Sequence, residues 1–210
     1  MQKLKYGNTN TFFIPGDGGG LLFDTDYAGT LPAFYKAIKK NGIEIKDIGY
    51  VLVSHFHPDH MGLVGDLTEK GVKLLLLDVQ RDQIWFSDHI FEKARLPFRP
   101  VDESAAVMIS CEESRDFLAG IGIHGEIIWT PSHSVDSVSL LLDDGDGFVG
   151  DLEPFEYLEA YDENSALKRD WEHILSFNPR TIFYAHRPEK KFDRPLQQVC
   201  RRSLPPQSND

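Results

Sequence analysis

The sequence has few cysteines and no long apolar run. Its two cysteines, Cys111 and Cys200, are far apart and outside any CxxC pattern, so we expect free thiols in a reducing compartment. No stretch approaches the roughly 20 apolar residues of a membrane-spanning helix, so we expect no membrane partner. The amino-terminal segment also lacks the apolar run of about 7–15 residues that a secretory signal requires. We therefore expect a cytoplasmic protein.

Basic residues are also scarce. There are 22 Lys and Arg against 33 Asp and Glu, which gives a formal net charge of −11 and a pI near 5.1. Because phosphate groups bind to clustered Lys and Arg, this charge argues against a nucleic-acid partner. The partner that we expect is a small-molecule substrate, and a homo-oligomer is compatible with the sequence.

The length of 210 residues, with 41% hydrophobic and 26% charged residues, suits one globular domain. No internal repeat or low-complexity block interrupts it. We predict a single domain over residues 1–200. The last ten residues, "RRSLPPQSND", are polar and contain two adjacent prolines, so we predict a flexible tail over residues 201–210.

Short apolar strands alternate with segments of helical periodicity. The mixture of hairpins and crossovers predicts sheets packed face to face with helices outside, although periodicity alone does not choose among such folds. We expect strands at 10–15, 18–26, 48–55, 72–78, 125–131, 137–144, 147–151 and 181–186, and helices at 31–42, 59–71, 79–95, 112–122 and 163–178.

The stretch "VLVSHFHPDH" ends a predicted strand with a cluster of metal-ligand side chains. His55 and His57 are two residues apart, so on an extended segment both imidazoles point to the same side. Pro58 is suited to the first turn of a helix, which would carry Asp59 and His60 beside the first pair. Imidazole and carboxylate groups are ligands for zinc, iron or manganese. The spacing therefore predicts parts of two metal sites.

Three further ligand-type residues follow predicted strands elsewhere. His133 lies in "WTPSHSVDS", Asp151 in "GFVGDLEP" and His186 in "TIFYAHRPE". Each comes at the carboxyl end of an apolar run. Grouped at one rim of a sandwich, they would complete two metal sites.

Together, H-x-H-x-D-H, the later T-P-x-H-[ST]-x-x-S, the G-D after a strand and the final histidine resemble the metallo-β-lactamase-fold hydrolase superfamily. The resemblance extends from about Thr9 to His186. It implies an α/β protein with an αβ/βα four-layer sandwich and a binuclear site at one edge. Zinc is the favoured metal, with iron or manganese as alternatives. The implied ligands are His55, His57 and His133 for one metal, Asp59, His60 and His186 for the second, and Asp151 as the bridge.

Several positions depart from the pattern of this superfamily. Ser132 stands where glycine is usual, and Val135-Asp136 replace a usual proline-glycine pair. About 24 residues follow His186, too few for the helical domain with which glyoxalase II-type enzymes bind glutathione. The zinc β-lactamases are secreted, and many have cysteine at the position of Asp151, so we do not expect antibiotic hydrolysis. Flavodiiron relatives have glutamate at the position of His57, which argues against a redox role.

The leading hypothesis is a metal-dependent hydrolase in which a hydroxide bridging two metals attacks a small ester, thioester or lactone. Asp59 is its candidate catalytic residue, taking a proton as the leaving group departs. The alternatives are a phosphodiesterase on the same centre, a diiron redox protein and a non-catalytic metal-binding protein. For Asp24, orienting a ligand histidine and capping a turn are both open. The sequence does not assign roles to Tyr157, Tyr161 or the segments Asp78–Val101 and Asp151–Glu163.

Overall fold

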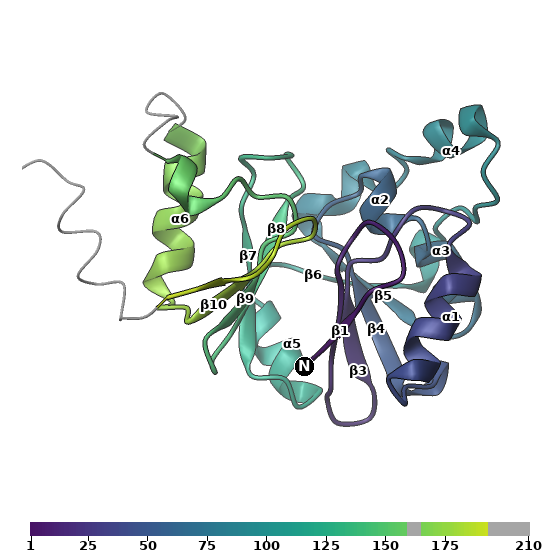
Figure 1. The fold of residues 1–210 in the computed structure, drawn as a ribbon, viewed down its shortest axis with the longest axis horizontal. Coiled ribbons are helices and arrows are strands. Elements are labelled where there is room, and N and C mark those ends of the chain that lie inside the picture. The colour runs from purple at the N-terminus through teal and green to yellow at the C-terminus, as the bar shows by residue number, and fades with distance from the viewer. Residues whose placement is uncertain (159–164, 193–210) are drawn as a thin grey trace, which may run out of the picture.

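The computed structural model describes residues 1–158 and 165–192, and two β-sheets pack face to face within them (Figure 1). One sheet has the strand order β1-β2-β3-β4-β5-β6 and the other has the order β11-β10-β9-β8-β7. Each contains parallel and antiparallel neighbours, so both are mixed. The strands are β1 (Gln2–Leu4), β2 (Thr11–Ile14), β3 (Gly20–Phe23), β4 (Ile48–Leu52), β5 (Lys73–Leu77), β6 (Ala106–Ile109), β7 (Gly125–Trp129), β8 (Val138–Leu142), β9 (Asp146–Phe148), β10 (Thr181–Phe183) and β11 (Lys190–Lys191).

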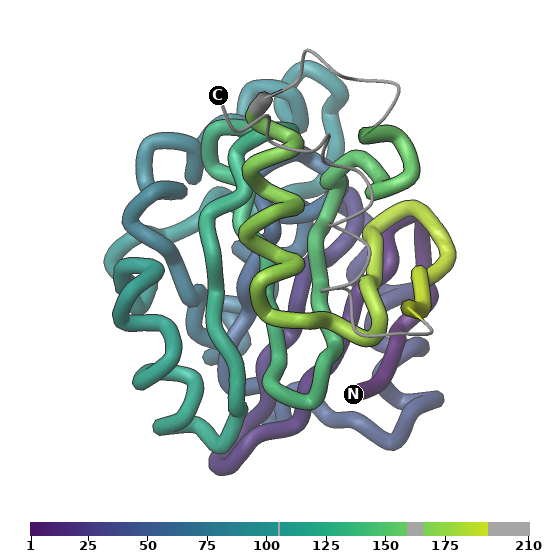
Figure 2. Tube along the Cα trace, turned by 90° about the vertical axis from the view of Figure 1, so that its left-hand side faces the viewer, coloured from purple at the N-terminus to yellow at the C-terminus, as the bar shows by residue number. Residues whose placement is uncertain are grey.

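Helices cover the outer faces of the sheets. Figure 2 shows the last long helix, α6, lying across the second sheet, while α1, α3 and α4 lie on the far side of the first sheet (Figure 1). The α-helices are α1 (Leu31–Lys40), α2 (Pro58–Met61), α3 (Val64–Glu69), α4 (Asp88–Ala94), α5 (Ser114–Gly120) and α6 (Ser165–Ser176), and the 3-10 helices are η1 (Ile45–Asp47), η2 (Asp78–Gln83), η3 (Glu103–Ala105) and η4 (Phe155–Tyr157).

Three apolar cores separate four layers, as the alternation of side chains along β5 shows. Leu74 and Leu76 point to the core beneath α1, α3 and α4, whereas Leu75 and Leu77 point to the core between the sheets. The third core lies beneath α6 around the fully buried Trp171. Burying a leucine completely stabilises the fold by about 1.5–3 kcal/mol, so a strand buried on both faces is strongly held. The predicted αβ/βα sandwich is confirmed.

The helix predicted over 59–71 is instead two short helices, α2 and α3. Thr25 explains the break, because its backbone N–H and its Oγ1 both donate to the carbonyl of His60 at 2.8 Å. The carbonyl of His60 therefore does not accept the backbone hydrogen bond that would continue the helix. Gly62 lies in the break, where a Cβ atom would stand 2.2 Å from the backbone nitrogen of Ala28. The chain passes too close to its neighbour there for any larger residue.

The helix predicted over 79–95 is also wrong in extent. The segment forms η2, then a turn through Trp85 and Phe86, and only then α4. Ser87 is fully buried in this turn, and its hydroxyl donates to the carbonyl of Phe56 at 2.6 Å. A tertiary hydrogen bond therefore overrides the local helical pattern. The short strands β1, β6 and β11 are further differences: β1 and β11 form antiparallel hairpins with β2 and β10, and β6 pairs in parallel with β5.

Within residues 1–158 and 165–192, no helix is long and apolar enough to cross a membrane. The single domain over 1–200 stays a prediction, and the tail over 201–210 lies outside the described residues. The strand ends that carry the predicted ligands, after β4, β9 and β10 and between β7 and β8, lie at one edge of the sandwich (Figure 1).

Candidate metal centre

The loop after β4 and the start of α2 carry four of the predicted ligands. His55 and His60 are completely buried, whereas His57 and Asp59 are partly accessible. His57 is the extended residue before α2, and Pro58 begins that helix, as its fixed backbone angle favours. The rings of His55 and His57 are 4.3 Å apart, and those of His55 and His60 are 4.2 Å apart. One strand-to-helix corner thus places three imidazoles around the same space.

The structure brings all seven predicted ligands together. Their nitrogen and oxygen atoms fall into three overlapping groups, with all ligand atoms of a group within 4.8 Å of one another. Two groups match the two sets implied by the resemblance, and the third joins atoms of both sets. We call His55, His57 and His133 the nitrogen half-site, and Asp59, His60 and His186 the mixed half-site. The third group is His55, His60 and Asp151.

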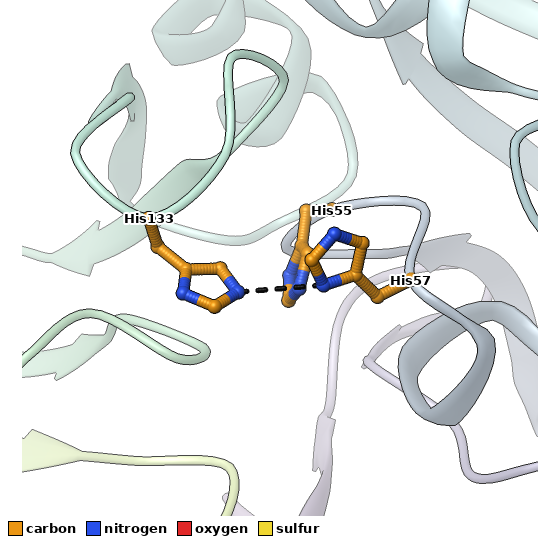
Figure 3. Close-up of side chains that lie close together, drawn as sticks. All are labelled: His55, His57 and His133. Carbon is orange, nitrogen blue, oxygen red and sulfur yellow. Dashed lines mark hydrogen bonds between the residues drawn. The ribbon is translucent and has the colours of Figure 1, made fainter.

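One pair of nitrogen atoms in the nitrogen half-site has the spacing of two ligands on one zinc ion. Figure 3 shows His57 and His133 pointing toward each other from different loops, with His55 beside them. The Nε2 atom of His133 lies 3.4 Å from the Nδ1 atom of His57. Two nitrogens bound to one tetrahedral zinc at about 2.0–2.1 Å are about 3.3–3.4 Å apart. The two loops are therefore already set at the separation that a shared ion requires.

The mixed half-site combines oxygen and nitrogen atoms. His186 Nε2 lies 3.0 Å from Asp59 Oδ2, and His60 Nε2 lies 3.9 Å from the same oxygen. Asp151 stands between the two half-sites. Its Oδ1 is 3.3 Å from His186 Nε2, while its Oδ2 is 3.4 Å from His60 Nε2 and 3.8 Å from His133 Nε2. A carboxylate that reaches both sets in this way can contribute an oxygen to each of two metals.

Two buried atoms in the centre make no hydrogen bond, namely Nε2 of His55 and Nε2 of His60, although Asp151 Oδ2 lies 3.4 Å from the latter as an ion-pair contact. A buried polar atom without a partner is costly, so such an atom needs an explanation. Each lies within a group of other ligand atoms. A divalent cation would satisfy both atoms, and the set of imidazoles and carboxylates is one that zinc, iron and manganese accept. The residues therefore fit a metal centre, and their ligation of metal stays a prediction.

Asp24 and Ser54 hold the opposite edges of the two buried rings. Asp24 Oδ2 lies 3.0 Å from His60 Nδ1, and Ser54 Oγ lies 3.0 Å from His55 Nδ1. The Ser54 hydroxyl donates to Asp24 Oδ2, and its backbone N–H donates to Asp24 Oδ1 at 2.6 Å. Of the two roles open for Asp24, the contacts support orienting a histidine. Gly150, with a φ of +56°, is required here because a Cβ would stand 2.4 Å from Ser54 Oγ.

Asp136 is a residue that sequence reasoning did not assign. It is only 2% exposed, and its Oδ2 accepts a hydrogen bond from the backbone N–H of Phe56 at 2.7 Å. Its Oδ1 accepts from the hydroxyl of Ser134. Gln80 donates to the carbonyls of both Val53 and Asp136, at 2.9 and 3.2 Å. These bonds join the loop after β4 to the loop before β8. The available signal was the departure of Val135-Asp136 from the usual proline-glycine pair.

The two half-sites differ in charge when no metal is bound. Burial lowers the pKa of His55 well below its ordinary value and also lowers that of His57. Burial acts the same way on His60, but the charges of Asp24 and Asp151 outweigh it and raise its pKa to about 10. His55 and His57 are therefore neutral at pH 7, while His60 carries a proton.

The acidic members of the centre show the complementary effect. Burial raises the pKa of Asp59, but its contact with His186 and the nearby His60 bring it down to about 2. Burial likewise opposes ionisation of Asp151, yet its contact with His60 holds its pKa below the ordinary value. The hydrogen bond with Asp59 raises the pKa of His186. Both carboxylates are therefore ionised and available as ligands at neutral pH.

The sequence assigns no role to Tyr157, which lies at the end of η4. The guanidinium of Arg187 lies 5.4 Å from the ring centroid of Tyr157 and donates a hydrogen bond to its hydroxyl at 3.3 Å. Arg187 directly follows His186, so this pair flanks the mixed half-site. Tyr161 and residues 159–163 of the segment after Asp151 lie outside the described residues.

The chain belongs to the metallo-beta-lactamase superfamily, whose sequence pattern it matches over residues 4–186. This superfamily consists largely of metal-dependent hydrolases and also includes diiron proteins. Its fold binds divalent metals, in keeping with the clustered histidines and aspartates.

Two curated proteins are similar over part of their length. The "Beta-lactamase-like protein 2 homolog" of Drosophila melanogaster is 24% identical over 85% of this chain and 58% of its own. The "Putative diflavin flavoprotein A 2" of Synechocystis is 34% identical over 68 residues, which are 32% of this chain and 11% of that protein. The chain thus spans less than two thirds of either relative.

Solved structures share the fold at low identity. A metallo-beta-lactamase family protein from Thermus thermophilus, TTHA1429, superposes with a TM-score of 0.69 at 18% identity, covering 92% of this chain and 72% of that one. TTHA1623 in a di-iron-bound form gives 0.67 at 19% identity, covering 91% and 94%. The B3 metallo-beta-lactamase BLEG-1 gives 0.69 at 18% identity, covering 93% and 96%. At these identities the likeness shows the fold.

Proposed function

We propose that this protein is a binuclear metal-dependent hydrolase acting on a small ester, thioester or lactone. The observation that carries the proposal is the cluster of seven ligand-type side chains, in which the buried Nε2 atoms of His55 and His60 make no hydrogen bond. The nitrogen half-site would hold one cation, and the mixed half-site would hold the second. Asp151 would contribute one oxygen to each, as its distances to both half-sites permit. We propose zinc as the native metal.

Two bound cations would lower the pKa of a water from about 16 toward about 7 and stabilise the negative charge that develops on the substrate oxygen. The residues of the chain supply position and proton handling. Asp24 and Ser54 hold His60 and His55 in fixed orientations. Asp59 is ionised at neutral pH, so its carboxylate can accept a proton and release it to the departing group.

The test is metal content and hydrolysis by the intact protein. We expect about two zinc ions per chain, and turnover of chromogenic esters, thioesters or lactones in preference to bis-p-nitrophenyl phosphate. His57→Ala and Asp151→Ala should each lower metal content and reduce kcat/KM at least about 100-fold, because each removes a ligand. His173→Ala, at an exposed position on α6, is the matched control and should change neither. Undiminished zinc and hydrolysis in both ligand variants would refute the proposal.

A diiron protein is the second candidate, since TTHA1623 is di-iron-bound and the Synechocystis relative is described as a diflavin flavoprotein. Imidazole and carboxylate ligands suit iron as well as zinc. His57 argues against this candidate, because flavodiiron relatives have glutamate at its position. Near-stoichiometric iron in protein purified without added metal, with visible colour and no ester hydrolysis, would favour the diiron protein over the hydrolase.

A further inference from the structure

Two exposed aromatic side chains stand beside the nitrogen half-site. Trp85 and Phe86, in the turn between η2 and α4, are 50% and 41% exposed. The ring centroid of Phe86 lies 5.3 Å from that of His57, with the two rings inclined by 34°. Neighbouring exposed aromatic residues are unusual on a protein surface unless they bind something. The contact of Phe86 with a predicted metal ligand places this aromatic pair next to the reacting bond of any substrate held there.

The turn that carries Trp85 and Phe86 is anchored by buried residues and a hydrogen bond. Ile84 and Ser87, on either side of the pair, are completely buried. The Ser87 hydroxyl donates to the carbonyl of Phe56, the residue between the ligands His55 and His57. The position of Phe86 is thus tied to the ligand loop by a buried hydrogen bond.

The loop of His133 presents apolar surface from a second segment. Val135 is 64% exposed and Trp129 is 48% exposed, and the Trp129 indole N–H donates to the carbonyl of Val135 at 2.8 Å. The eight large hydrophobic side chains that are exposed in residues 1–158 and 165–192 include four in these two segments. The charged Arg187, by contrast, flanks the mixed half-site beside Tyr157. The exposed apolar side chains of these two segments thus neighbour residues of the nitrogen half-site, in space or along the chain, whereas Arg187 adjoins the mixed half-site.

We propose that Phe86 and Trp85 bind the apolar acyl group of the substrate, so that the preferred substrates are esters, thioesters or lactones of medium-length acyl chains. This inference rests on the proposed hydrolase function and names the substrate class of the same site. An acyl chain that leaves the nitrogen half-site toward Phe86 would cover aromatic surface that otherwise faces water. Each buried methylene then strengthens binding by up to about fourfold.

The first experiment measures kcat/KM of zinc-loaded protein for p-nitrophenyl acetate, butyrate, hexanoate and octanoate. We expect kcat/KM to rise with chain length, and Phe86→Ala to flatten the rise so that the octanoate loses about tenfold more than the acetate. Phe86→Leu should restore most of the dependence, because leucine keeps an apolar surface. Met108→Ala is the matched control, since Met108 is 51% exposed on β6. Zinc content and circular dichroism confirm that each variant is folded and loaded.

The second experiment does not depend on turnover. Zinc-loaded protein is titrated with acetate, hexanoate and octanoate while tryptophan fluorescence is recorded, and Trp85→Phe identifies the signal of Trp85. We expect octanoate to bind at least about tenfold more tightly than acetate, and Phe86→Ala to remove the difference. If octanoate binds in this way but no ester, thioester or lactone is hydrolysed, the result refutes the proposed hydrolase function and supports acyl binding by Phe86 and Trp85.

Either of two outcomes would overturn the acyl site. One is hydrolysis and binding that are both independent of chain length in the wild-type protein, which would leave the hydrolase proposal intact. The other is a change from oligomer to monomer in Phe86→Ala, seen by sedimentation, with the chain-length dependence unaltered. That result would make Trp85 and Phe86 a contact between subunits.

Discussion

The nitrogen half-site and the mixed half-site lie side by side but are built on different principles. In the nitrogen half-site, burial keeps His55 and His57 neutral, and the hydrogen bond from the backbone N–H of Phe56 to the Asp136 carboxylate ties their loop to the loop of His133. In the mixed half-site, the charges of Asp24, Asp59 and Asp151 hold a protonated His60. One region is organised by packing and hydrogen bonds, and the other by ion pairs.

This difference implies that a metal ion competes with a bound proton in the mixed half-site but not at His55 and His57. A cation entering the nitrogen half-site finds His55 and His57 neutral and displaces no proton from either ring. A cation entering the mixed half-site must displace the proton of His60, because a metal ligand has to be deprotonated. The metal affinity of the nitrogen half-site should therefore depend mainly on the positions of its rings. The metal affinity of the mixed half-site should depend on the nearby charges and on pH.

The largest effect should come from breaking one half-site at a time. His133→Ala removes a ligand of the nitrogen half-site, and His186→Ala removes one of the mixed half-site. Each variant should keep about one zinc per chain and lose hydrolysis by about a thousandfold or more, because the two cations act on the same water. Metal analysis and kcat/KM measure this. Loss of both metals in either variant would show that the half-sites do not fill separately.

The charge that organises the mixed half-site can be removed without touching a ligand. Asp24→Asn should weaken zinc binding there by about 10–100-fold, as loss of a group that orients a ligand histidine usually does. The nitrogen half-site should keep its affinity, which competition with a zinc-binding dye would show. Asp26→Asn is the control, since Asp26 is also buried but accepts from the backbone of Thr9 and Tyr27. Equal effects of the two variants would contradict this assignment.

Zinc affinity should depend on pH at the mixed half-site far more than at the nitrogen half-site. The pKa of His60 is raised to about 10 in the metal-free protein, so its proton must leave throughout the range from pH 6 to 9. Affinity there should rise by about tenfold per pH unit. The same raised pKa stabilises the metal-free fold fully below about pH 6.5, and this stabilisation is lost as the pH rises through about 10. Calorimetric titrations with zinc at three pH values test the difference.

The smallest effect should come from Asp136, which sets the nitrogen half-site through Phe56. Asp136→Ala leaves the buried N–H of Phe56 without its acceptor, so we expect a loss of about 1–3 kcal/mol in the free energy of unfolding. Asp136→Asn keeps an acceptor and should lose less. Weaker zinc binding at the nitrogen half-site, with the mixed half-site unchanged, would separate a positioning role from general destabilisation. Identical affinities at both half-sites would argue for stability alone.

Much of the centre was predictable from the sequence because each candidate ligand lies in a short, recognisable segment at the end of a strand. His55, His57 and His60 share one strand-to-helix corner, and His133, Asp151 and His186 each follow an apolar strand. The two-residue period of a strand and the helix-starting proline are properties of short segments, so they can be read without a fold. The break at Gly62 could not be predicted in this way, because Thr25 causes it from a distant strand end.

The sequence by itself determined the set of candidate ligands, the alternation of strands and helices, and the acidic balance that argues against nucleic acid. Only the tertiary structure decided that Asp136 and Gln80 join two ligand loops, that Asp24 contacts His60, and that Phe86 lies against His57. The physical reason is the distance along the chain over which each interaction acts. Backbone periodicity and chain stiffness act over a few residues, whereas these contacts join residues that approach only when strands pair and sheets pack.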